Sequence, residues 1–140
     1  MNPEIKPLQG FEKLNFGTQI DLVRANLGVA YKTFKRTPAA EMPCDFFESL
    51  GIFTYYKSTG VLEAIEFVSP AKPFYGGVSL LEAGVDEIKK IFMKHDSDIE
   101  ETDDGFTSYK LGIGIYAPDA DEKPSLPPES VIAFAKDYYD

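Results

Sequence analysis

The six-residue pattern Leu-Gly-Ile-x-x-Tyr occurs twice in the chain, at residues 50–55 and again at residues 111–116. Each copy lies in a stretch rich in aromatic and β-branched residues, which favour strands. Upstream of each copy, in residues 16–27 and 85–95, apolar residues recur at i, i+3 and i+7, the spacing of an amphipathic helix. The same order, a helix followed by strands, thus occurs twice in the chain. It predicts an α+β fold of two degenerate helix-plus-antiparallel-β-sheet repeats that share one core.

The two halves are expected to correspond position by position within one domain that spans residues 1–140. The repeat-like halves, 14–70 and 77–140, are joined by a seam at 69–77 that is rich in proline and glycine. Each half alone would leave one face of a small antiparallel sheet exposed, so a shared core is expected. Three equivalences express the correspondence: Ile20 with Val85, Leu50 with Leu111, and Leu62 with Val131.

Residues typical of helix termini flank or begin both predicted helices. For the first helix, Thr18 is the expected N-cap and Gly28 the expected C-terminal stop. For the second, Ser79 and Glu82 have the spacing of a capping box. That box would start the helix before Gly84, which would then lie inside it at a cost of about 1 kcal/mol.

The strands are expected in the segments that are rich in aromatic and β-branched residues. Residues 46–56 and 61–68 flank the turn sequence KSTG and predict a β-hairpin. Residues 106–116 and 130–139 are each expected to form one strand. Four further segments are expected to be connections: 29–44 with at most a short edge strand, the irregular seam 69–77, the acidic loop 96–105 and the Pro-rich loop 117–128.

The net charge of the chain indicates which classes of molecule are expected as its binding partner. The sequence has 23 acidic and 14 basic residues, which gives a net charge of −9. Proteins that bind phosphate backbones or anionic membranes need an excess of Lys and Arg, so neither nucleic acid nor a membrane is an expected partner. A basic protein is the favoured partner, because long-range attraction would steer it toward an acidic surface.

The expected location is the cytoplasm. No apolar run approaches the ~18 residues needed to span a bilayer, and the opening residues do not follow the pattern of a signal peptide. Cys44 is the only cysteine, so no disulfide forms within the chain and a reducing compartment is compatible. With apolar neighbours, Cys44 is expected to pack as a small core residue.

Few residues have the chemistry of a catalytic or metal site. His95 is the only histidine, and it falls at the end of a predicted helix, where a cation is favoured. One histidine and one cysteine do not make a zinc site. The acidic loop fails the EF-hand spacing, because Glu101 occupies the position that requires glycine. A non-catalytic protein without a metal or cofactor is therefore expected.

Residues 16–67 resemble the helix-plus-meander unit of two related bacterial groups: the small lipoprotein of the outer-membrane β-barrel assembly machine, and β-lactamase inhibitor protein, which contains two such units in tandem. The second half resembles the unit less closely. The resemblance implies a scaffold that presents a sheet face and loops to another protein. The sequence has no lipidation cysteine near Met1, so the lipoprotein's location is not implied. The matching positions are Gly17, Val23, Leu27, Gly28, Tyr55, Gly60, Val61 and Ile65.

The function expected from these features is a protein-binding module, and its most concrete form is a bacterial immunity or inhibitor protein that docks a basic partner. The expected contacts are carboxylates of the acidic loop and strand tyrosines: Asp98, Glu100, Glu101, Asp103, Asp104, Tyr55, Tyr56 and Tyr116. Two alternatives remain open. One is a small-ligand-binding protein, or a carboxylate-only enzyme, with a pocket between helix and sheet. The other is a structural subunit of a homo-oligomer such as a homodimer.

Overall fold

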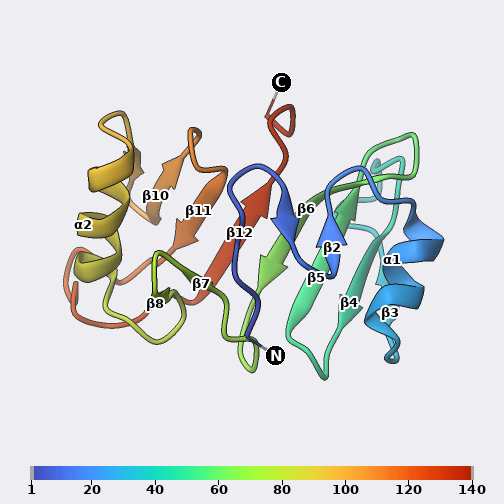
Figure 1. The fold of residues 1–140 in the computed structure, drawn as a ribbon, viewed down its shortest axis with the longest axis horizontal. Coiled ribbons are helices and arrows are strands. Elements are labelled where there is room, and N and C mark those ends of the chain that lie inside the picture. Colours follow the sequence, from blue (N-terminus) through green and yellow to red (C-terminus); the bar gives the residue numbers. More distant parts are fainter. Residues whose placement is uncertain (1, 140) are drawn as a thin grey trace.

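The computed structural model describes residues 2–139 and combines two helices with a large antiparallel sheet (Figure 1). This confirms the α+β class. Helix α1 comprises Ile20–Leu27 and helix α2 comprises Val85–His95. In order across the sheet, the eight strands are β3 (Lys32–Phe34), β4 (Cys44–Phe47), β5 (Ile52–Tyr56), β6 (Leu62–Phe67), β12 (Ser130–Phe134), β11 (Ile113–Tyr116), β10 (Gly105–Ser108) and β9 (Glu100–Thr102).

The strands of the first and second halves of the chain meet at the centre of this sheet. There β6 pairs antiparallel with β12, so that Phe67 lies opposite Val131 and Ile65 lies opposite Ala133. On either side the order is the same, with each helix followed in sequence by four strands that pair as neighbours. The eight strands therefore form one continuous sheet with β3 and β9 at its edges.

The strand registers show that two of the three expected equivalences are not mutually consistent. Ile52 lies opposite Phe67 in the first half, and Ile113 lies opposite Ala133 in the second. An alignment that matches Leu50 with Leu111 also matches Ile52 with Ile113, and it places Val131 with Ile65 rather than with Leu62. The expected equivalences of Leu50 with Leu111 and of Leu62 with Val131 therefore do not hold together. The loops before β6 and β12 differ in length, and only the register reveals the offset.

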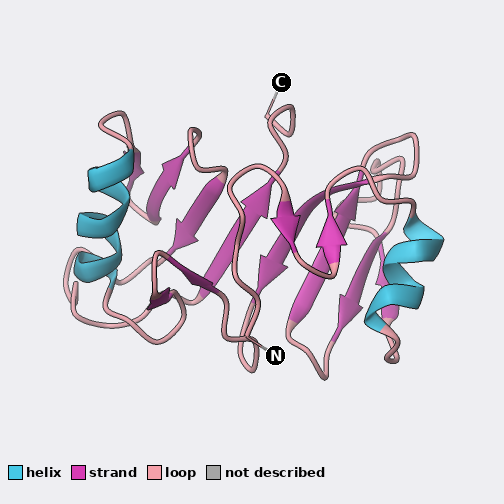
Figure 2. Cartoon of the chain, viewed as in Figure 1, coloured by secondary structure: helices cyan, strands magenta, loops and turns pink. Residues whose placement is uncertain are grey.

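One face of the sheet, here called the inner face, carries almost all of the elements outside the sheet (Figure 2). Helices α1 and α2 cover its two ends. Between them lie the N-terminal segment with β1 (Gly10–Phe11) and β2 (Leu14–Asn15), and the small hairpin of β7 (Phe74–Tyr75) and β8 (Val78–Ser79). The main core is apolar and buried between these layers: it includes Val23, Leu27, Phe47, Ile52, Ile65, Phe67, Ile88, Phe92, Ile113 and Val131.

Helix α1 starts without the expected side-chain cap. Its N-cap residue is Gln19, and the Thr18 hydroxyl instead donates a hydrogen bond to the Asn15 carbonyl at 2.7 Å. The first helical N–H, that of Ile20, donates to the carbonyl of Gly60 in the β5–β6 turn at 3.0 Å. A tertiary contact thus replaces the cap. The C-terminal prediction is confirmed, since Gly28 ends the helix in the left-handed conformation at φ 62°.

Helix α2 begins later than its capping-box spacing predicts. Ser79 donates to Glu82 at 2.8 Å, but the pair lies in a turn before the helix, which starts at Val85 with Gly84 as N-cap. The N–H groups of Val85 and Asp86 donate to backbone carbonyls of residues 126 and 124, both at 3.0 Å. The Pro-rich loop therefore caps this helix. A Cβ at position 84 would lie 2.8 Å from the carbonyl oxygen of residue 125, so glycine fits there.

Several predicted segments contain more strand boundaries than the sequence pattern indicates. Segments 46–56 and 106–116 each divide into two strands, with a turn at the Leu-Gly pair. The predicted hairpin of residues 46–68 is confirmed in its β5–β6 part. Strand β7 lies in the seam expected to be irregular, and β9 lies in the segment expected to be an acidic loop. The last strand stops at Phe134, and turns follow it.

Candidate protein-binding face

The opposite face of the sheet, here called the outer face, carries a row of side chains that crosses all eight strands. The row follows from the registers of neighbouring strands, since residues directly opposite one another project to the same side. Its members are, in order from β3 to β9, Lys32, Phe46, Phe53, Glu66, Ile132, Gly114, Thr107 and Glu100. Lys32 and Glu100 are exposed, and the residues between them are half-buried except Gly114.

Aromatic rings occupy the β3–β5 end of this face. The rings of Phe46 and Phe53 stack with their centroids 4.1 Å apart, and Phe34 meets Phe53 edge-on at 6.0 Å. Phe34 is 39% exposed. On β11, at the other end of the face, Tyr116 is 46% exposed. Rigid, partly exposed aromatic rings of this kind provide large contact area at low entropic cost.

A second, smaller apolar cluster lies under part of the outer face. It consists of Cys44, Tyr55, Ala64 and Phe134, and among the described residues no helical residue belongs to it. Tyr138, which follows β12, stacks on Phe134 with a centroid distance of 5.8 Å. Cys44 is 3% exposed, which confirms that it packs as a core residue.

Tyr55 and Tyr56, which were expected to offer exposed contact surface, are each only 6% exposed, so that expectation is wrong. The guanidinium of Arg36 lies 4.0 Å from the ring centroid of Tyr55 and covers it. The Tyr55 hydroxyl donates to a carboxylate oxygen of Glu66 at 2.5 Å. Burial, together with this carboxylate, raises the pKa of Tyr55 above its ordinary range. Tyr116 is therefore the one tyrosine of the three that is exposed.

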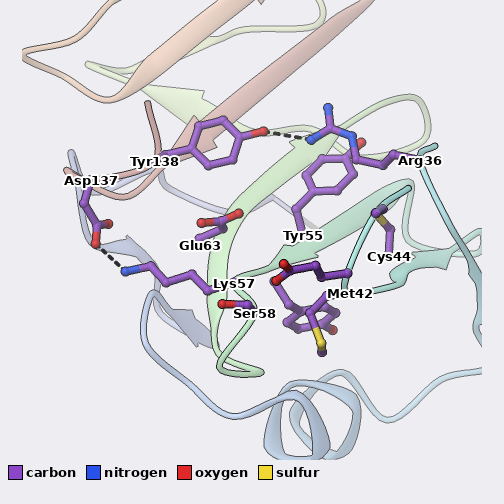
Figure 3. A pocket seen from close by; sticks show the side chains of 12 residues that line it. Arg36, Met42, Cys44, Tyr55, Lys57, Ser58, Glu63, Asp137 and Tyr138 are labelled. Carbon is purple, nitrogen blue, oxygen red and sulfur yellow. Dashed lines mark hydrogen bonds and ion pairs between the residues drawn. The ribbon is translucent and has the colours of Figure 1, made fainter. Parts of the chain in front are cut away.

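A polar cavity of about 480 Å³ opens beside this cluster, between the loop after β3, the β5–β6 turn and the residues after β12 (Figure 3). Arg36 donates to the Tyr138 hydroxyl at 2.9 Å, and Lys57 forms an ion pair with Asp137. Glu63 lies between these two pairs in the figure. Burial raises the pKa of its carboxyl. The cavity thus combines both signs of charge around a partly desolvated carboxylate.

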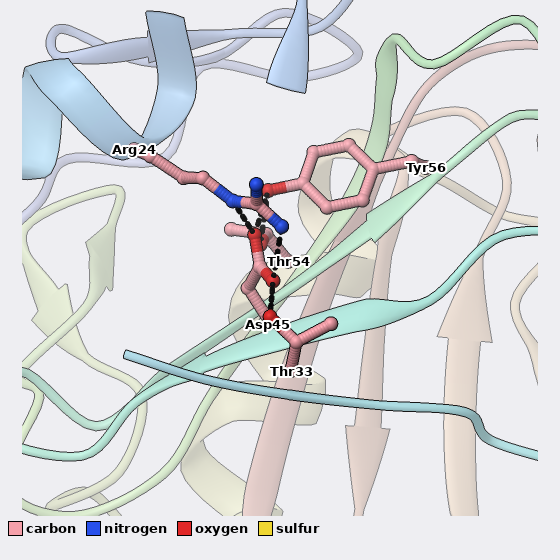
Figure 4. A network of polar contacts seen from close by, with 5 residues as sticks. All are labelled: Arg24, Thr33, Asp45, Thr54 and Tyr56. Carbon is pink, nitrogen blue, oxygen red and sulfur yellow. Dashed lines mark hydrogen bonds and ion pairs between the residues drawn. The ribbon is translucent and has the colours of Figure 1, made fainter. Parts of the chain in front are cut away.

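On the inner face, Asp45 is the centre of a buried polar network (Figure 4). Its side chain is fully buried, and Arg24 from α1 donates to both carboxylate oxygens, from Nε at 2.8 Å and from Nη2 at 3.0 Å. Thr33 and Tyr56 donate to it at 2.9 and 2.8 Å. The Tyr56 hydroxyl in turn lies 2.8 Å from that of Thr54. The network ties α1 to three strands and has a structural role.

The buried carboxylates of Asp45 and Asp96 make the stability of the fold dependent on pH. Burial alone would raise the pKa of Asp45, but donors from Arg24, Tyr56 and Thr33 outweigh it and the pKa is lowered. The pKa of Asp96 is lowered mainly because the Ser108 hydroxyl donates to its carboxylate at 2.7 Å. A carboxyl with a lowered folded-state pKa stabilises the fold above its unfolded pKa of about 4, and this contribution is lost as the pH falls further.

We therefore expect the thermal unfolding midpoint to change little between about pH 7 and pH 5, and to fall steadily from about pH 4 to pH 2. Circular dichroism melts across this range measure it. Ser108→Ala removes the main donor to Asp96, so this variant should be less stable at neutral pH and should lose less stability in acid. A midpoint that stays constant from pH 5 to pH 2 would contradict the assignment.

The predicted acidic contact residues are all exposed but do not share one surface. Glu100 lies opposite Thr107 on the outer face. Glu101 projects to the inner side and forms an ion pair with Lys89 of α2. The remaining acids lie at the ends of β9: Asp98, Asp103 and Asp104. Asp103 lines a cavity of about 290 Å³ against α2, whereas Asp104 lines a hollow on the outer face.

The structure therefore brings Glu100, Asp104 and Tyr116 to the outer face, and it adds Glu66, Ile132 and Gly114, which sequence reasoning missed. The alternation along the predicted strand 61–68 already puts Glu66 on the face opposite Ile65, and that was the available signal. His95 lies exposed at the end of α2, edge-on to Tyr75 at 5.8 Å.

The fold and this face define a class: an α+β protein in which helices cover one face of an eight-stranded antiparallel sheet and the other face is largely uncovered. No family model, curated protein or solved structure matches the chain. Within residues 2–139, no helix is long and apolar enough to cross a membrane. In the same part of the chain, no group of three or more His, Cys, Asp or Glu residues is placed to hold a metal ion.

Proposed function

We propose that this chain is a non-catalytic protein-binding module whose outer face docks a basic protein. The observation that carries the proposal is the outer face, which has stacked aromatic rings at one end, and the exposed Tyr116 with the carboxylates of Glu100 and Asp104 at the other. An immunity or inhibitor role against a basic toxin is its most concrete form. Neither a nucleic acid nor a membrane is part of the proposal, because the net charge of −9 would repel both.

On such a face, the net charge and the aromatic rings contribute to binding in different ways. The negative net charge raises the rate of encounter with a basic partner, and the aromatic rings supply the desolvated contacts that hold it. A face of half-buried apolar side chains with a charged rim is the usual anatomy of a protein interface. We place the protein in the cytoplasm, where its single buried thiol stays reduced.

We further propose that the two halves derive from an internal duplication, as the expected kinship with the tandem helix-plus-meander unit implies. The registers support this. With Ile65 matched to Val131 and Phe67 to Ala133, the pairing of Phe67 with Val131 becomes the pairing of Ala133 with Ile65 when the halves are exchanged. This is the behaviour of a two-fold axis between β6 and β12.

A small-ligand-binding role is the second candidate function. The cavity beside Arg36 and Glu63, about 480 Å³ in volume, supports it, because this size suits a small polar molecule. This cavity lies on the outer side of the sheet rather than between helix and sheet. A ligand that fills it would raise the unfolding midpoint at a fixed protein concentration.

The docking proposal is tested by two lysine substitutions with the same change of net charge. Ile132→Lys places a cation at the centre of the outer face, and Leu22→Lys places one on α1, the helix at one end of the inner face, where Leu22 is 58% exposed. Each variant serves as bait for source-cell lysate, with elution by increasing salt. We expect one basic protein to bind the wild type and Leu22→Lys about tenfold or more tightly than Ile132→Lys.

Equal retention by both variants would refute the outer face as the docking site. Equal melting curves for the two baits establish that the loss reflects the interface rather than unfolding. Retention of only further copies of this chain would support the remaining alternative, a structural homo-oligomer, and would make the unfolding midpoint dependent on protein concentration.

A further inference from the structure

We propose that the hollow above Gly114 on the outer face receives an arginine side chain of the partner. This inference rests on the proposed function, because it names the chemical group that the docking face recognises. It concerns one end of that face, around β10 and β11, and not the aromatic end.

The hollow exists because position 114 has no side chain. It has a volume of about 270 Å³, and its walls near Gly114 are formed by Thr107, Tyr116 and Ile132. A Cβ at position 114 would lie 3.0 Å from Cγ2 of Ile132 and 3.4 Å from Oγ1 of Thr107. A side chain at position 114 would therefore crowd both walls and occupy the hollow.

Two carboxylates line this hollow, at its opposite ends. Glu66 lies on β6, two strands from Gly114 or roughly 10 Å at the usual strand spacing. Asp104 lines the hollow itself at the β9–β10 turn. A carboxylate beside the apolar side chain of Ile132 favours a cation with an apolar stem.

The one basic residue that lines the hollow, Arg36, lies at its opposite end. Its guanidinium covers the ring of Tyr55, whose hydroxyl donates to Glu66, so its charge lies beside that carboxylate. It is also held there by its hydrogen bond to Tyr138. The charges of Arg36 and Glu66 thus offset one another, and Asp104 makes the β9–β10 end of the hollow negative.

Arginine fits this environment better than lysine. A planar guanidinium stacks on an exposed tyrosine ring and presents a fork of donors to a carboxylate, whereas an ammonium is a compact and strongly hydrated charge. Tyr116 supplies the ring and Asp104 the carboxylate, while Ile132 contacts the methylene stem. The recognised group is thus a partner arginine that reaches across β11.

The test uses a minimal probe on the full chain. Acetyl-arginine N-methylamide and its citrulline counterpart, which has the same shape without the charge, are titrated while backbone amide signals are followed by NMR. We expect the amides of Gly114, Thr107 and Tyr116 to shift with the arginine probe and to saturate in the millimolar range. The citrulline probe should bind at least about threefold more weakly.

Adjacent aspartates provide matched variants. Asp104→Asn removes the carboxylate that lines the hollow, and Asp103→Asn makes the same change of net charge one residue away, in the cavity that faces α2. The arginine probe should bind Asp104→Asn about threefold or more weakly, with no change for Asp103→Asn. Three results would each refute the proposal that the hollow binds an arginine side chain (the arginine socket). These are equal effects of the two variants, equal affinity for the two probes, and amide shifts that lie away from Gly114.

The two proposals fail separately. If the probe does not bind but Ile132→Lys still abolishes capture of a basic protein, the docking face stands and the arginine socket is wrong. If the probe binds at Gly114 but no basic protein is retained by the wild type, the socket stands and the proposed partner class is wrong.

Discussion

Replacing Asp45 with alanine is expected to lower the free energy of unfolding by about 3 kcal/mol, at the lower end for a broken buried ion pair because Arg24 keeps some exposure. The substitution removes the common acceptor of Arg24, Thr33 and Tyr56. The guanidinium and the two hydroxyls that now donate to Asp45 would then lack an acceptor at a site that water does not reach freely. Each buried donor without a partner lowers the free energy of unfolding. The effect should be largest near neutral pH, where the carboxylate is ionised in both states.

Urea unfolding followed by circular dichroism measures this loss. Thr33→Val is the matched comparison, because it deletes one donor to the same carboxylate, keeps the β-branched shape and leaves the ion pair with Arg24 intact. We expect it to cost about 1 kcal/mol. Similar losses for both variants would mean that Asp45 contributes no more than one hydrogen bond, contrary to the network in Figure 4.

Replacing Gly51 with alanine is expected to have an effect at least as large. Gly51 has φ +68°, and a Cβ there would lie 2.1 Å from the Val68 carbonyl oxygen and 2.9 Å from the Ala71 amide nitrogen. Both contacts are with backbone, so relief requires that β5 and the chain after β6 move apart. The Gly51 carbonyl also accepts the N–H of Val68 at 2.8 Å, and that bond would be strained. We expect a loss of about 3 kcal/mol or more.

Gly77→Ala separates the steric cost from the conformational one. Gly77 also has a positive φ, +78°, but among residues 2–139 no atom outside its immediate neighbours lies within 4 Å of a Cβ placed there. It should therefore cost only the left-handed penalty of about 1 kcal/mol. Thermal melts of the two variants give the comparison, and a Gly77→Ala loss as large as that of Gly51→Ala would exclude the backbone contact as the cause.

The two Leu-Gly pairs illustrate how far the sequence pattern could predict this fold. The repetition was visible, the apolar spacing predicted both helices, and the strand-forming residues on either side of KSTG predicted the β5–β6 hairpin, which together gave the α+β class. The role of the glycines was not visible: Gly51 and Gly112, at φ +68° and +67°, form turns inside segments that are continuously rich in strand-forming residues. Neither glycine is flanked by Pro, Asn or Asp, the residues that commonly indicate a turn. Each segment was therefore expected to form one strand, whereas the structure has two.

The candidate face was harder to predict because it depends on which elements cover which side of the sheet. Tyr55 and Tyr116 belong to equivalent-looking strands, yet one is buried and the other exposed. The difference comes from Arg36, which is distant from Tyr55 in sequence but covers its ring in the fold, where Tyr138 accepts a hydrogen bond from it. Likewise, the N–H groups that begin both helices are satisfied by distant carbonyls, which hydrophobic spacing and capping signals do not report.

The pairing of β6 with β12 has a consequence for folding. Strand β12 is the last strand in the described chain, while β6 is complete before the second half has been made. Until β12 arrives, the backbone edge of β6 and its apolar side chains lack their partner, which is the situation in which unfinished sheets aggregate. The central contact also joins distant parts of the sequence, so it closes late and slows folding. The middle of the finished sheet is therefore the most vulnerable part of the nascent chain.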